Sequence, residues 1–175
     1  MRTELRPYWL ANRASEWCYI VGRASDTSRF GQPDILRQVD THLYGAHMCV
    51  LALWHLHRCL GHLEELNVEL SSSTGDFVAR FKYEYEKAKV EDARHALEHE
   101  EDRVSGLKLH GRPAYQGDFP NPRVTGRKSH SSRLTMIQAL DEDFELSEVI
   151  EAALALEEPL RELASVRFAN STGGM

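Results

Sequence analysis

The residues that could do acid–base or phosphate chemistry gather in one short segment, residues 90–102. It holds an arginine, two histidines and six carboxylates: Arg94, His95, His99, Glu91, Asp92, Glu98, Glu100, Glu101 and Asp102. A histidine can take or give a proton near neutral pH, and an arginine fork stabilises the negative charge that develops on a phosphate. Such a pair could cleave RNA through attack by the 2′-hydroxyl, without a metal and with a cyclic phosphate as product.

This segment falls in a stretch that is free of helix breakers. Residues 76–105 contain no glycine or proline, and Gly106 follows, so we predict one helix of roughly eight turns with an N-cap at Ser73. On a straight helix Arg94 and His99 lie about 140° apart. Asp92, His95 and His99 instead share one stripe, because they follow steps of three and four residues. The predicted helix therefore favours contact among these three residues.

Three further helices are predicted from apolar spacing. The first covers 7–24, the second runs from Pro33 to about Leu66, and the last covers 148–168, where Pro159 should kink or split it. The predicted core stripe of the second helix is Leu36, Val39, Leu43, Ala46, Val50, Trp54 and His57. Residues 133–140 alternate weakly and predict a short strand that pairs near Arg123 and Val124. We therefore predict an all-α fold: one domain over 1–175, an antiparallel four-helix bundle with a long basic loop at 106–133 and a short β-hairpin before the last helix.

Charge is unevenly distributed along the chain. The formal net charge of -6 argues against broad, non-specific binding of nucleic acid. Residues 106–133 nevertheless carry six Lys and Arg against one acid, and five of these cations are candidate RNA contacts: Lys108, Arg112, Arg123, Arg127 and Lys128. The same loop could simply complement the acidic helices of its own chain, so both interpretations stay open.

Composition indicates a globular protein of the cytoplasm. Hydrophobic residues make up 42% of the chain and charged residues 27%. We find no apolar run long enough for a membrane span and no apolar core of a signal peptide near the N-terminus. The three cysteines are odd in number and include no Cys-x-x-Cys, so we expect reduced thiols.

The motif Arg94-His95-x-x-x-His99, expected in the third helix of a four-helix frame, resembles the HEPN superfamily. Members are helical bundles, and many are metal-independent ribonucleases of toxin–antitoxin, phage-defence and CRISPR systems. The resemblance implies that His99 is the catalytic base or acid and that Arg94 binds phosphate. His95 would help to orient the site, with Glu91 or Asp92 as the acid that many members carry. It further implies a homodimer that brings two motifs into one cleft, and no metal cofactor.

Two alternatives stay open. The segment could be a solvated helix face with pairs such as Arg94–Glu98, in a non-catalytic interaction or scaffold protein with an antitoxin-like partner. It could also bind a metal through Asp92, His95 and His99. The fourth ligand would then come from a histidine of the second helix: His42, His47, His55, His57 or His62.

Overall fold

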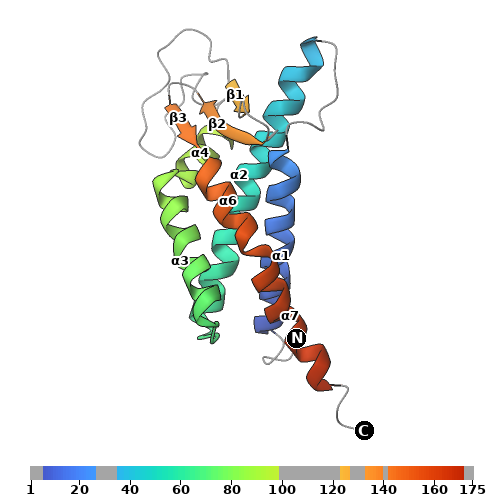
Figure 1. Cartoon of the computed structure of the whole chain (residues 1–175). Helices are drawn as coiled ribbons and strands as arrows, with labels where there is room; N and C mark the ends of the chain where they lie inside the picture. Colours follow the sequence, from blue (N-terminus) through green and yellow to red (C-terminus); the bar gives the residue numbers. More distant parts are fainter. Residues whose placement is uncertain (1–5, 27–34, 99–122, 127–132, 140–141, 172–175) are drawn as a thin grey trace.

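The computed structural model describes residues 6–26, 35–98, 123–126, 133–139 and 142–171. Side chains are described within 6–26, 45–98, 133–138 and 142–165. This part of the chain is mostly helical, with one small antiparallel sheet. Helices α1 (Arg6–Ser25) and α2 (Ile35–Glu65) run alongside each other, and α7 (Glu157–Ser171) packs on α1. Helices α3 (Ser72–Lys87) and α6 (Ser147–Ala155) complete the helical layer, and the sheet lies at the end of the molecule next to α4 (Val90–Glu98) (Figure 1). Within the described residues no helix is long and apolar enough to cross a membrane.

The first two helices confirm their predicted extents. Helix α1 spans Arg6–Ser25 and α2 spans Ile35–Glu65. The face of α1 that is buried consists of small side chains at helical spacing, namely Ala11, Ala14, Ser15, Cys18, Val21 and Ser25. Small residues let the backbones of two helices approach closely, and α1 packs along both α2 and α7.

The predicted core stripe of α2 is confirmed at Ala46 and Val50, which are buried, but after Val50 the buried stripe is turned by about one residue. Leu53, Leu56 and Leu60 are fully or almost fully buried, whereas Trp54 and His57 are only partly buried. A shift of one position rotates a helix face by about 100°. Trp54 and His57 therefore lie beside the core, where they can contact side chains of other helices.

The prediction of one continuous helix over 76–105 is wrong. Helix α3 spans Ser72–Lys87, α4 spans Val90–Glu98, and the chain turns between them. Lys89 has φ 50°, in the left-handed region, and its backbone N–H bonds to the carbonyl of Glu86 at 3.0 Å. This left-handed position is occupied by a lysine and not by a glycine. The turn lets Val90 and Ala93 bury completely, which offsets the strain. Burial of α4 thus outweighs the strain at Lys89.

The start of α3 also differs from its prediction. Ser71, and not Ser73, is the N-cap, and its Oγ accepts a hydrogen bond from the backbone N–H of Thr74 at 3.2 Å. The two serines are equivalent by residue type. Which serine caps the helix depends on the conformation of the preceding turn, and residue type alone does not predict it.

Three short strands form a sheet of order β1-β2-β3: β1 (Arg123–Gly126), β2 (Leu134–Ala139) and β3 (Glu142–Glu145). The predicted pairing near Arg123 is confirmed, since Arg123 lies opposite Gln138 and Val124 opposite Ile137. Strand β3 was not predicted, because its sequence Glu-Asp-Phe-Glu is mostly acidic. Its one buried residue, Phe144, pairs with the fully buried Ile137 and fixes the strand on the core.

Pro159 divides the last helix as predicted. Helix α6 spans Ser147–Ala155 and α7 spans Glu157–Ser171, with Leu156 between them. Proline has no backbone N–H to donate to the carbonyl four residues earlier, so the helical hydrogen-bond pattern is interrupted there. Leu156 and Leu160 are both fully buried and keep the two helices on the same core.

The turn at Lys89 leads to a stability prediction. Lys89→Gly should raise the free energy of unfolding by about 0.5 kcal/mol or more, because glycine relieves a left-handed conformation that costs an L-residue about 1–2 kcal/mol. The control Glu86→Gly lies inside α3 and should lower it by about 1 kcal/mol. Urea unfolding of both variants measures the difference. A continuous helix would instead make both changes destabilising by similar amounts.

Candidate site around Arg94

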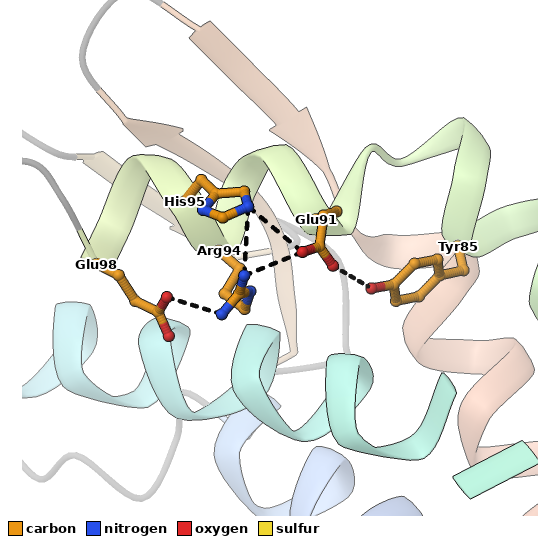
Figure 2. Close-up of polar contacts among 5 residues, drawn as sticks. All are labelled: Tyr85, Glu91, Arg94, His95 and Glu98. Atoms are coloured by element: carbon orange, nitrogen blue, oxygen red, sulfur yellow. Dashed lines mark hydrogen bonds and ion pairs between the residues drawn. The ribbon is translucent and has the colours of Figure 1, made fainter. Parts of the chain in front are cut away.

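Helix α4 presents one polar stripe above α2. Val90, Ala93 and Ala96 are buried, and α4 packs on α2 and β2. This packing leaves the opposite positions, Glu91, Arg94, His95 and Glu98, along one side of α4 at steps of three and four residues. Figure 2 shows Arg94 reaching down into the space between the α4 and α2 ribbons.

The guanidinium of Arg94 is held on three sides. Its Nη2 donates to Glu91 Oε1 at 3.0 Å and its Nη1 donates to Glu98 Oε2 at 2.9 Å (Figure 2). Its Cζ lies 4.5 Å from the centre of the Trp54 ring on α2. Only 15% of the Arg94 side chain is exposed, and its Nε is buried with no hydrogen-bond acceptor among the described residues. Arg94 therefore joins α4 to α2 by charge and by stacking.

His95 lies against the same guanidinium. Its Nε2 is 3.3 Å from Arg94 Nη2 and 3.4 Å from Glu91 Oε1. A neutral imidazole can accept a hydrogen bond from Arg94 through Nε2, whereas an imidazolium can pair with the carboxylate of Glu91. About a third of the His95 side chain is exposed, at 34%. A proton acceptor, a fixed cation and a carboxylate thus converge at a side chain that is partly exposed.

Tyr85 orients Glu91 and is itself held by His57. The hydroxyl of Tyr85 on α3 donates to Glu91 Oε2 at 3.4 Å (Figure 2). Burial raises the pKa of Tyr85, and the charge of Glu91 adds to the effect, so Tyr85 stays protonated and remains a donor. The Tyr85 ring stacks on His57 of α2, with ring centres 4.2 Å apart and planes 8° from parallel. The turn between α3 and α4 is what brings Tyr85 back to Glu91.

The predicted site residues are only partly brought together. Arg94 and His95 are neighbours, and the predicted Arg94–Glu98 pair is confirmed. Asp92 is partly buried on α4, whereas His99 lies outside the described residues. Arg123 belongs to β1, where only the backbone is described. The other predicted RNA contacts lie outside the described residues: Lys108, Arg112, Arg127 and Lys128.

The metal interpretation gains no support from the described side chains. Among them, no three histidine, cysteine, aspartate or glutamate residues are placed to hold a metal ion. His55 and His57 of α2 stack on aromatic rings. His62 Nδ1 lies 2.9 Å from Glu65 of its own helix. The proposed ligands His99 and His42 are not among the described side chains.

Two functional neighbours were missed from the sequence. The sequence places Trp54 in the core stripe of the second helix and does not single out Tyr85, yet both contact the polar stripe of α4. The sequence could have indicated that the Trp54 ring contacts cations, because Arg58 follows Trp54 by one helical turn. The Cζ of Arg58 lies 5.0 Å from the ring centre. Tyr85 had no such signal, since its role depends on the turn at Lys89.

Comparison of the chain with protein-family models, with curated proteins and with solved structures gives no match. The function of the site therefore has to be inferred from its own residues.

The contacts of Arg94 with Glu91, Glu98 and Trp54 should contribute to the free energy of unfolding. Arg94→Ala should lower the free energy of unfolding by about 1–2 kcal/mol, because it removes two charged hydrogen bonds and the stacking on Trp54. The control is Arg80→Ala, whose half-exposed side chain lies 3.8 Å from Glu148 and should matter by less than about 0.5 kcal/mol. Equal losses in the two variants would show that Arg94 does not join the helices.

His55 should make the fold sensitive to mild acid. Burial lowers the pKa of His55 from its ordinary value of 6.5, and Arg58, Arg13 and Arg94 lower it further. Between the folded and unfolded pKa values the unfolded chain binds more protons, so stability is present above about pH 6.5 and is lost as the pH falls through this window. Urea unfolding from about pH 7.5 to about pH 5.5 should show a larger loss for wild type than for His55→Phe. His57, whose pKa is also lowered, by burial first and then by Lys82, stays in both proteins as a common background.

Proposed function

We propose that this chain is a HEPN-like, metal-independent endoribonuclease that acts on RNA at Arg94 and His95. The observation that carries the proposal is the convergence of three groups: His95 Nε2 lies within 3.4 Å of both Arg94 Nη2 and Glu91 Oε1. A proton acceptor, a phosphate-binding cation and a carboxylate that supports the imidazolium are the groups that this reaction needs.

The proposed reaction uses the 2′-hydroxyl of the RNA as the nucleophile. His95 Nε2 takes the proton, O2′ bonds to phosphorus, and the bond from phosphorus to O5′ breaks. The products are a 2′,3′-cyclic phosphate and a 5′-hydroxyl, whose oxygen takes a proton from the second histidine that the HEPN resemblance implies, His99. Glu91 pairs with the new imidazolium, and Arg94 stabilises the oxyanions at phosphorus after a phosphate oxygen replaces Glu98.

The wider frame of the proposal comes from the spacing, composition and charge of the sequence and, for the homodimer, from the resemblance. It includes a four-helix bundle, a location in the cytoplasm and a homodimer in which two such clusters face one cleft. It also includes contacts between RNA and the basic residues of 106–133.

A second candidate is favoured by a specific observation. Both ends of the Arg94 guanidinium already bind carboxylates of α4, as in an arginine that only holds a helix in place. In that case the protein is a non-catalytic interaction or scaffold module on the same frame.

An RNA cleavage assay separates the two candidates. Purified protein is incubated with end-labelled RNA in the presence of a chelator, and the ends of the products are identified by mass spectrometry. Wild type should give fragments with 2′,3′-cyclic phosphates, and His95→Ala and Arg94→Ala should each slow cleavage by about 10²-fold or more. The matched control is His62→Ala, because His62 also lies beside a glutamate.

Cleavage by wild type that His95→Ala and Arg94→Ala leave unchanged would overturn the assignment of both residues. Intact RNA with wild-type protein at every concentration would favour the scaffold candidate.

A further inference from the structure

We propose that single-stranded RNA binds along a ladder of aromatic rings and cations that crosses α1 and α2 and ends at Arg94. The ladder consists of Trp9, Arg13, Trp17, His55, Trp54 and Arg58. The inference rests on the proposed function in one respect: the ladder would lead RNA to the proposed cleavage cluster around Arg94. Its evidence comes from separate contacts, and it can be tested without cleavage.

On α1 the ladder follows the turns of the helix. Trp9, Arg13 and Trp17 are each four residues apart and so lie on one side of α1. The Arg13 Cζ lies 5.8 Å from the Trp9 ring centre and 5.9 Å from the Trp17 ring centre. The guanidinium therefore lies between two indole rings, and all three groups form one row.

The row then crosses to α2. The Trp17 ring stacks on His55 with centres 4.3 Å apart and planes 8° from parallel. His55 meets the edge of Trp54 at 4.7 Å, and Arg58 and Arg94 lie over Trp54 at 5.0 and 4.5 Å. Each member thus contacts the next, and the last one is the arginine of the proposed cleavage cluster.

The first part of the ladder is open to solvent. Trp9 is 51% exposed and the Arg13 side chain 46% exposed. Tyr19 is also 55% exposed and has Arg23 over its ring at 5.9 Å, but it lies about 160° from Trp17 around α1 and is not part of this row. Trp9 and Arg13 therefore place an exposed ring and an exposed cation side by side at this end of the ladder.

This pattern fits unpaired nucleotides better than other ligands. Unpaired bases stack on aromatic rings and on guanidinium planes, while the arginine edges face the phosphates. The ladder itself contains three cations, counting Arg94, and no carboxylate; two of these cations already pair with acids, Arg13 with Glu16 and Arg94 with Glu91 and Glu98. No carboxylate among the described residues lies within ion-pair distance of Arg58, so this cation is available to a phosphate. A paired duplex buries its bases and could not stack in this way.

His55 serves the ladder as a neutral ring. Burial and the three surrounding arginines lower its pKa below its ordinary value of 6.5, so it is mostly uncharged at pH 7 while it stacks face to face on Trp17 and meets Trp54 at its edge. A charged imidazolium at this position would repel Arg13, Arg58 and Arg94.

The test is fluorescence anisotropy with a labelled single-stranded RNA of mixed sequence and with a blunt-ended RNA duplex that has no unpaired bases. Full-length protein carrying His95→Ala is used, so that cleavage does not remove the probe. Trp9→Ala and Arg58→Gln, both changes on the surface, should each weaken binding of the single strand about 5-fold or more, since one stacked base contributes about 1–3 kcal/mol. The matched controls are Tyr83→Ala and Arg80→Gln on α3; Tyr83 is 64% exposed and also has a cation, Lys87, over its ring. Both controls should bind like the parent.

The outcomes separate this inference from the proposed function. Ladder variants that bind RNA as the parent does would overturn the ladder, even if wild type cleaves RNA. Equal affinity for the duplex and the single strand would also overturn it. Ladder-dependent binding in a protein that cleaves nothing would leave the ladder standing and remove the nuclease proposal.

Discussion

The contact between the guanidinium of Arg94 and the indole of Trp54 is the one on which the site depends. It couples α4, a short helix that follows a left-handed turn, to the long and well-buried helix α2. A nine-residue helix has little stability of its own in water, so its place is set by packing and by this contact. The positions of Glu91, His95 and Glu98 follow, because they share one rigid element with Arg94.

Most of the helical frame could be predicted because it is encoded locally. Apolar spacing located α1 and α2 within two residues of their ends in the structure, and Pro159 correctly divided the last helix. The Arg94–Glu98 pair was also predictable, since residues four apart on a helix are always neighbours. These features need no knowledge of distant parts of the chain.

The rest could not be predicted because it depends on tertiary packing. Nothing between Asp76 and Ser105 favours a helix end, yet the chain turns at Lys89 so that Val90 and Ala93 reach the core. The contact of Tyr85 with Glu91 exists only because of that turn. Likewise, the core stripe of α2 includes Leu53 and Leu56 instead of Trp54 and His57, a choice between adjacent apolar positions that neighbouring helices decide.

Binding of a phosphate at Arg94 would have an energetic consequence for the fold itself. The guanidinium can exchange Glu98 for a phosphate oxygen without losing a charged hydrogen bond, and its stacking on Trp54 can persist through the exchange. Glu98 would then face solvent, where a carboxylate costs little. The interaction that holds α4 on α2 could therefore be shared with RNA at small cost to stability. Under the proposed function, the site would be stable without a phosphate, because Glu91 and Glu98 pair with the guanidinium of Arg94.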